Sequence, residues 1–189
     1  MKKILYAFIA LMVIAMASCN GNGTKRAVLS AAGDSTNVVE VDENDSTVYG
    51  VAGDGSAMHS LELITDDGDT IIYLMNLDSD TDPVVGGIMT GDRMAVIGYK
   101  DGDGEMIANK VINITTLLGK WTSIDKNFQI EEGGKIESYV KAEQNPWTSW
   151  RISNGRLVIN RDTFDINNLS ADSLSLENKN GIFDYKRQK

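Results

Sequence analysis

The chain has 189 residues, which is enough for one medium-sized domain or two small ones. Its 18 basic and 27 acidic side chains give a formal charge of −9, and no basic patch is visible, so the composition argues against a nucleic-acid partner. A single Cys excludes an internal disulfide framework, and a single His excludes any site that needs two imidazoles.

The first 18 residues have the pattern of a secretion signal. Lys2 and Lys3 form a positively charged start, and an almost unbroken apolar run follows over 4–16. Crossing the hydrocarbon of a bilayer takes about 20 apolar residues, so this run is too short for a comfortable transmembrane helix. We therefore predict a signal peptide over residues 1–18.

The signal ends in Met16-Ala17-Ser18-Cys19, which resembles the bacterial lipobox. The resemblance implies cleavage before Cys19 and attachment of acyl chains such as palmitate to its thiol and to the new amino group, making the membrane a partner of the chain. A plain signal peptide that leaves a free thiol is the alternative. Asn20 resembles the residue that permits sorting to the outer membrane, so the expected location is the bacterial cell envelope, with the leaflet left open.

Residues 19–46 show little apolar periodicity and are interpreted as a flexible tether. The remainder divides by charge. Residues 20–117 hold 5 basic and 17 acidic side chains, whereas residues 118–189 hold 11 basic and 10 acidic ones. This shift, at a junction that contains glycine, predicts two structural units over 47–117 and 118–189.

The first unit alternates short strand candidates with Asp/Gly turns. The expected strands are Val48–Ala52, Ser60–Thr65, Thr70–Asn76, Met94–Lys100 and Met106–Ile114. Their number and spacing resemble a small OB-like barrel. OB-type barrels that bind nucleic acid or sugar display basic and aromatic side chains, whereas this unit is acidic and its only aromatic residues are Tyr49, Tyr73 and Tyr99.

The second unit has eight segments in which apolar residues alternate with polar ones. They are Gly119–Ile124, Asn127–Glu132, Lys135–Val140, Thr148–Ile152, Arg156–Asn160, Thr163–Ile166, Ser173–Glu177 and Ile182–Lys186. Gly133-Gly134 and Asn154-Gly155 supply the positive φ of tight hairpins. The pattern predicts an up-and-down antiparallel barrel. The predicted fold class is therefore all-β, with two small antiparallel barrels or meanders.

Several motifs of the second unit resemble the lipocalin-like domains of bacterial lipoproteins. They are the Gly-x-Trp start at 119–121, the stretches 130–135, 150–157 and 169–174, and the ending at 185–188. The resemblance covers about 70 residues and implies a small antiparallel barrel that binds an apolar ligand. It also implies that Arg187 packs over Trp121 to close the base of the barrel, a structural rather than a ligand-binding pair.

The alternation within the strands selects the residues expected to line a ligand site. They are Phe128, Ile136, Trp150, Leu157 and Phe164. Trp150 and Ile152 are two residues apart and lie on the same face of the expected strand. Trp150 is therefore expected to point inward and Trp147 outward. There Trp147 would contact a partner or a sugar ring, or simply be one of the scattered aromatic side chains that are normal on protein surfaces.

The sequence gives little support for a catalytic activity. His59 has Ser56 and Ser60 nearby, but the chain contains no Gly-x-Ser-x-Gly elbow, so an exposed position at a strand edge is favoured. No phosphate-binding glycine motif is present either, and no cofactor is expected. With 27 acids in the chain, the number of possible carboxylate pairs makes a hydrolase prediction uninformative.

Two acidic runs have the spacing of a calcium loop without its other requirements. Asp78, Asp80 and Asp82 are followed by Pro83 where the loop needs Gly, and the run that starts at Asp101 fails in the same way. Solvated hairpin tips are favoured, and weak calcium association is left open. The methionines of the first unit are interpreted as core filling rather than as ligands of a soft metal, so no metal site is expected.

The sequence therefore predicts a non-catalytic, lipid-anchored envelope lipoprotein that binds a small apolar ligand. The alternative is an interaction or structural module whose acidic first unit, or the seam between units, docks another envelope protein.

Overall fold

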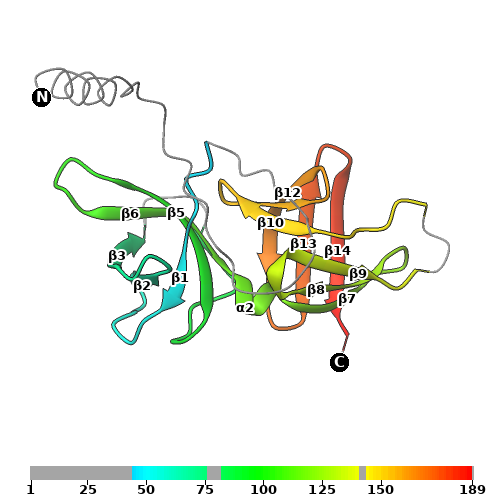
Figure 1. The fold of residues 1–189 in the computed structure, drawn as a ribbon, viewed down its shortest axis with the longest axis horizontal. Coiled ribbons are helices and arrows are strands. Elements are labelled where there is room, and N and C mark those ends of the chain that lie inside the picture. The colour runs from blue at the N-terminus through cyan, green and yellow to red at the C-terminus, as the bar shows by residue number, and fades with distance from the viewer. Residues whose placement is uncertain (1–43, 76–81, 141–143, 189) are drawn as a thin grey trace, which may run out of the picture. The chain divides into compact units, whose positions relative to one another are not determined.

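The computed structural model describes residues 44–75, 82–140 and 144–188. The predicted signal peptide, Cys19 and almost all of the predicted tether lie outside these residues, as do Asp78 and Asp80. The described residues belong to one compact unit, Glu40–Lys189. They form two β-sheets, and helix is confined to one turn of α-helix and one turn of 3-10 helix (Figure 1).

The first sheet has six strands. They are β1 (Val48–Ala52), β2 (Ser60–Thr65), β3 (Thr70–Met75), β4 (Val84–Val85), β5 (Arg93–Lys100) and β6 (Met106–Asn113). The five strands predicted from alternation are therefore confirmed to within about a residue over their described parts. The two-residue β4 was not predicted, because a strand so short shows no alternation.

The pairing closes the first sheet into a ring. Strand β1 pairs with β2 and β5, β2 pairs with β3, and β6 pairs with both β3 and β5. The ring departs from the predicted antiparallel arrangement in one respect, because β3 and β4 each run parallel to β6. Closure leaves one inner face, which buries Leu61, Leu63, Tyr73, Met94 and Val111.

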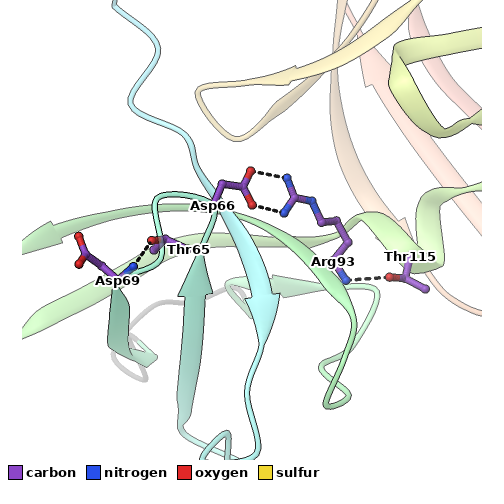
Figure 2. Close-up of polar contacts among 5 residues, drawn as sticks. All are labelled: Thr65, Asp66, Asp69, Arg93 and Thr115. Carbon is purple, nitrogen blue, oxygen red and sulfur yellow. Dashed lines mark hydrogen bonds and ion pairs between the residues drawn. The ribbon is translucent and has the colours of Figure 1, made fainter. Parts of the chain in front are cut away.

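An ion pair fixes one turn of this sheet against β5. The guanidinium of Arg93 donates two hydrogen bonds to the carboxylate of Asp66, in the turn after β2 (Figure 2). The backbone N–H of Arg93 donates to Oγ1 of Thr115 at 2.8 Å. The turn itself is tightened by Asp69, whose N–H donates to Thr65 Oγ1 at 3.1 Å.

The second sheet follows α2 (Ile114–Leu117) and has eight strands. They are β7 (Gly119–Thr122), β8 (Asn127–Glu131), β9 (Lys135–Ser138), β10 (Trp150–Ser153), β11 (Arg156–Ile159), β12 (Asp162–Leu169), β13 (Ser173–Asn178) and β14 (Gly181–Arg187). The 3-10 turn η1 (Glu132–Gly134) joins β8 to β9. All eight predicted segments are confirmed as strands.

The second sheet is an antiparallel barrel, as predicted. Within β7–β9 and within β10–β14 each strand pairs with the next one in sequence, and the last strand, β14, pairs with the first, β7. Strands β9 and β10 are not ladder partners; a single bridge between Lys135 and Ser149 spans that gap. Asn154 has φ 48° and Gly155 φ 71°, the positive values expected for this two-residue hairpin turn.

The two sheets share part of their core. Val85, Ala95 and Ile112 of the first sheet belong to the same buried cluster as the interior of the second barrel. The hydroxyl of Tyr49 donates to the carbonyl of Ile152 at 2.7 Å, and the N–H of Asn154 donates to Asp45 Oδ1 at 2.9 Å. Contacts of this kind tie the chain just before and within β1 to the β10–β11 hairpin.

Candidate functional site

The base of the second barrel is closed by Trp121 and Arg187. These two residues are register partners on β7 and β14, and the guanidinium carbon lies 4.2 Å from the centre of the indole ring. Trp121 is fully buried and donates from Nε1 to the carbonyl of Leu117 at 2.9 Å. Arg187 donates to the carbonyls of Leu118 at 2.7 Å and Ala171 at 2.5 Å, so this end of the barrel is capped by hydrogen bonds.

The opposite end of the barrel, which we call the mouth, contains a cavity of about 950 Å³. It is lined by residues from the β7–β8 and β13–β14 connections, from the chain before β10, from the ends of β7, β12 and β13, and from most of β14. Ligand pockets in proteins are typically about 300–1,000 Å³, so the mouth is large enough for one small molecule.

The floor of the mouth is aromatic. Trp147 packs edge-to-face against Phe128 with ring centres 4.9 Å apart, and against Phe164 at 5.8 Å. Tyr185 lies 5.1 Å from Phe128, and Phe183 lies 6.3 Å from Phe164. Four of these five rings, all except Phe128, also line the cavity. The floor can therefore contact an apolar molecule over several ring faces.

Trp147 is a correction to the sequence prediction, which placed it outward. Its exposed fraction is 9 %, and it belongs to the buried core. Asn160 explains the difference, because its side-chain amide holds the chain on both sides of Trp147. Asn160 Nδ2 donates to the carbonyl of Pro146 at 3.1 Å, and Asn160 Oδ1 accepts from the N–H of Thr148 at 3.0 Å.

Charged side chains surround the floor. The ammonium of Lys126 lies 4.5 Å from the centre of the Trp147 ring, and burial lowers the pKa of this lysine. Burial, with contributions from Asp125 and Asp184, raises the pKa of Tyr185 to about 12. Tyr185 is therefore an uncharged phenol at neutral pH, which suits an apolar floor.

The residues predicted to line a ligand site fall in three places. Phe164 lines the mouth. Phe128, Ile136 and Leu157 are at most 3 % exposed and pack within the core. Trp150 is partly buried and lines a separate cavity of about 450 Å³ with Tyr49 and Arg93, while its Nε1 donates to the carbonyl of Glu131 at 2.8 Å.

Of the residues chosen by alternation within the strands, only Phe164 lines the mouth. A barrel of short strands fills its middle with side chains, so space remains only where strands end and turns begin. The available signal was the alternation of Phe183 with Tyr185 directly after a turn. Trp147 had no such signal, because a side chain–backbone contact from Asn160 decides its direction.

The other candidate residues from the sequence analysis, His59 and the acidic run at Asp101, belong to turns. His59 is exposed in the turn before β2. Asp101 accepts from the N–H groups of Asp103 and Glu105, as a hairpin tip does. Among the described residues, no group of three or more His, Cys, Asp or Glu side chains gathers where it could hold a metal ion.

The methionines predicted to fill the core divide between core and surface. Met75 and Met94 are buried, whereas Met58 and Met89 are exposed. Within the described parts of the chain, no helix has the length and apolarity to cross a bilayer.

Comparison with known proteins supports the lipocalin-like interpretation for the second barrel. A family model described as lipocalin-like matches residues 113–188, which begin at the end of β6 and include all eight strands of the second sheet. No curated protein and no solved structure matches the chain. The C-terminal part of the chain, residues 113–188, is a lipocalin-like domain.

Proposed function

We propose that the chain is a non-catalytic, lipid-anchored envelope lipoprotein whose lipocalin-like domain binds one small apolar ligand at the mouth. The observation that carries the proposal is the cavity of about 950 Å³ over an aromatic floor. Burial of a ligand there gains about 25 cal/mol for each Å² of apolar surface removed from water. The family match adds support, because it covers the whole barrel that holds the cavity.

Native mass spectrometry of the chain purified from its own source tests ligand binding. We expect a retained apolar molecule, and we expect Phe183→Asp to lose it, because this substitution places a carboxylate in the lining of the cavity. Tyr99→Asp, which adds the same charge on β5 of the first sheet, is the control and keeps the ligand. A wild-type chain that carries no ligand contradicts the proposal, and thermal unfolding verifies that both variants fold.

The lipid anchor is a separate part of the proposal and has its own test. Its support is the lipobox-like sequence that ends at Cys19. The intact mass of the purified chain is expected to correspond to cleavage before Cys19 with acyl chains added. Cys19→Ala is expected to accumulate as the uncleaved precursor. A mature chain whose Cys19 still reacts with a thiol reagent contradicts the anchor.

The first sheet supports a second candidate function, docking of another envelope protein. In support, its five strands pair into a closed ring, which resembles a small OB-like barrel. Val51, Ile64 and Ile72 are exposed on neighbouring strands of this ring, at 36 %, 46 % and 59 %. Cross-linking in membranes is expected to recover a stoichiometric partner, and Ile72→Glu to reduce its yield; a yield that Ile72→Glu leaves unchanged contradicts docking at this face.

A further inference from the structure

The hydroxyl of Tyr185 is a polar group in the floor of the mouth. Only 3 % of Tyr185 is exposed, and its ring packs against Phe128 in the core of the barrel. The hydroxyl forms no hydrogen bond with any residue that the structure describes. Its oxygen is not sealed off either, because the one fully buried side-chain oxygen or nitrogen without a partner in the described residues is Oδ1 of Asn127. The hydroxyl of Tyr185 therefore reaches the cavity that the residue lines.

Tyr49 shows what happens to a comparable hydroxyl elsewhere in the chain. Burial raises the pKa of Tyr49 and of Tyr185 to about 12, so both phenols are largely removed from water and both stay uncharged. The Tyr49 hydroxyl gains a partner in exchange, because it donates to the carbonyl of Ile152 at 2.7 Å. A hydroxyl that leaves water without a replacement hydrogen bond costs free energy. A bound molecule that offers an acceptor to Tyr185 removes this cost.

The cavity gives a ligand access to this hydroxyl along one side of β14. Strand β14 has seven residues, but the ladder that joins it to β7 includes only Lys186 and Arg187. Beyond this ladder the cavity continues between the two segments, lined by residues 122–126 on one side and 182–186 on the other. A ligand that enters at the turns can therefore extend down to Tyr185.

The charges of the cavity favour an uncharged ligand. Five charged residues line it, namely Asp125, Asp162, Asp184, Lys126 and Lys186. Asp125 and Asp184 are the ones that act on the Tyr185 hydroxyl, and their carboxylates repel an anionic group placed there. The ammonium of Lys126 lies 4.5 Å from the centre of the Trp147 ring, and it repels a cationic group placed on this part of the floor. An uncharged polar group meets neither repulsion.

We propose that the ligand of the mouth is an apolar molecule that carries an uncharged oxygen, in a hydroxyl or a carbonyl group, and that this oxygen accepts a hydrogen bond from the Tyr185 hydroxyl. The inference rests on the proposed ligand binding and names the chemical class of the ligand. The apolar part of the molecule covers the rings of Trp147, Phe164 and Phe183. Tyr185 is then the residue that distinguishes among apolar molecules by their polar group.

Isothermal titration calorimetry of the full chain near neutral pH tests this class with four probes that share a naphthalene ring. They are 2-naphthylmethanol, 2-methylnaphthalene, 2-naphthoate and 2-naphthylmethylammonium. We expect wild type to bind 2-naphthylmethanol more tightly than either charged probe. Tyr185→Phe keeps the ring and removes the hydroxyl, so it is expected to weaken binding of 2-naphthylmethanol about threefold to tenfold, the effect of one hydrogen bond between uncharged groups. It is not expected to weaken binding of 2-methylnaphthalene, which has no oxygen.

Tyr49→Phe is the matched control, because it removes a phenol hydroxyl of similar burial that lines the separate cavity of about 450 Å³. It is expected to leave the affinities for all four probes unchanged. Thermal unfolding gives a second comparison. Tyr49→Phe loses the hydrogen bond to Ile152 and should unfold at a lower temperature, whereas Tyr185→Phe loses no hydrogen bond within the described residues and should not. A titration into detergent alone corrects each probe for partition into micelles.

Three results would overturn the inference. They are an unchanged affinity of Tyr185→Phe for 2-naphthylmethanol, an equal loss of affinity for 2-naphthylmethanol and 2-methylnaphthalene, and tighter binding of a charged probe than of 2-naphthylmethanol by wild type. Native mass spectrometry separates these results from a failure of the proposed function. A retained molecule whose exact mass contains no oxygen supports ligand binding and overturns this inference alone, whereas a chain that retains no molecule and binds none of the four probes contradicts both.

Discussion

Arg187 stacks on Trp121 across neighbouring strands, with its guanidinium carbon 4.2 Å from the centre of the indole ring. The contact joins the first and last strands of the second barrel, which are about 65 residues apart in sequence. A planar guanidinium can stack on an aromatic ring and still donate hydrogen bonds in its own plane. Arg187 does both, because it also binds the carbonyls of Leu118 and Ala171.

Replacing Trp121 by Ala is expected to destabilise the second barrel without removing ligand binding. Trp121 is fully buried at the closed end, opposite the mouth, and large-to-small changes of a buried Trp cost about 3–5 kcal/mol. Thermal and urea unfolding measure the loss. Arg187→Lys keeps the charge but cannot reproduce the fork of hydrogen bonds, and a loss of about 1–3 kcal/mol is expected. Near-unchanged stability of Trp121→Ala would refute the structural role of this pair.

Gly119 is required by its conformation and by its neighbour. Its φ is 128°, and a Cβ at this position would lie 2.4 Å from Nη1 of Arg187. Gly119→Ala is therefore expected to strain the backbone and to displace Arg187 from Trp121. Gly68→Ala is the control, because Gly68 also has a positive φ, 91°, but no atom within 4 Å of its Cβ position. Urea unfolding should show the larger loss for Gly119→Ala; equal losses would mean that only backbone strain matters.

Trp147→Ala tests whether this residue belongs to the core. A buried Trp in contact with three other rings is expected to cost about 3 kcal/mol or more on truncation, whereas an exposed one changes stability by less than about 0.5 kcal/mol. The same substitution removes part of the cavity floor, so retention of an apolar ligand should fall as well. Thermal unfolding and native mass spectrometry are the two measurements. A stable variant that keeps its ligand would place Trp147 outside the site.

Asn160→Gly tests whether the side-chain amide of Asn160 holds Trp147 in place, because Trp147 itself is left unchanged. Asn160 has φ 53°, which Gly adopts without strain, so the substitution removes mainly the amide that holds Pro146 and Thr148. We expect the N–H of Thr148 to exchange faster with deuterium and the emission of Trp147 to shift to longer wavelength. Asn154→Gly, at the other asparagine with a positive φ among the described residues, is the control and should leave both signals unchanged.

The Asp66–Arg93 pair makes stability depend on pH. Hydrogen bonds from Arg93 lower the pKa of Asp66 below its ordinary value of 3.8. A carboxyl with a lowered folded pKa contributes stability above its unfolded pKa, and this contribution is lost as the pH falls through the lowered value. Both side chains are substantially exposed, so Asp66→Asn is expected to cost only about 0.2–1 kcal/mol near neutral pH.

Urea unfolding at several pH values measures the difference in free energy of unfolding between wild type and Asp66→Asn. The difference between wild type and Asp66→Asn should be present near neutral pH and should close in acid. Asp67→Asn, which removes the same charge one residue away, is expected to leave the stability near neutral pH within about 0.5 kcal/mol of wild type. A gap that stays constant down to acid pH would show that the pair does not titrate as its hydrogen bonds require.

Much of the second barrel could be predicted from the sequence because its strands and turns are specified by residues that are close together in the chain. Alternation along a strand selects the inward face, as at Leu174 and Leu176, and Asn154-Gly155 determines a turn within two residues. The tertiary structure alone decided the parallel pairing of β3 with β6, the direction of Trp147 and the place of the cavity. Each of these depends on contacts between segments distant in sequence, and no local periodicity records such contacts.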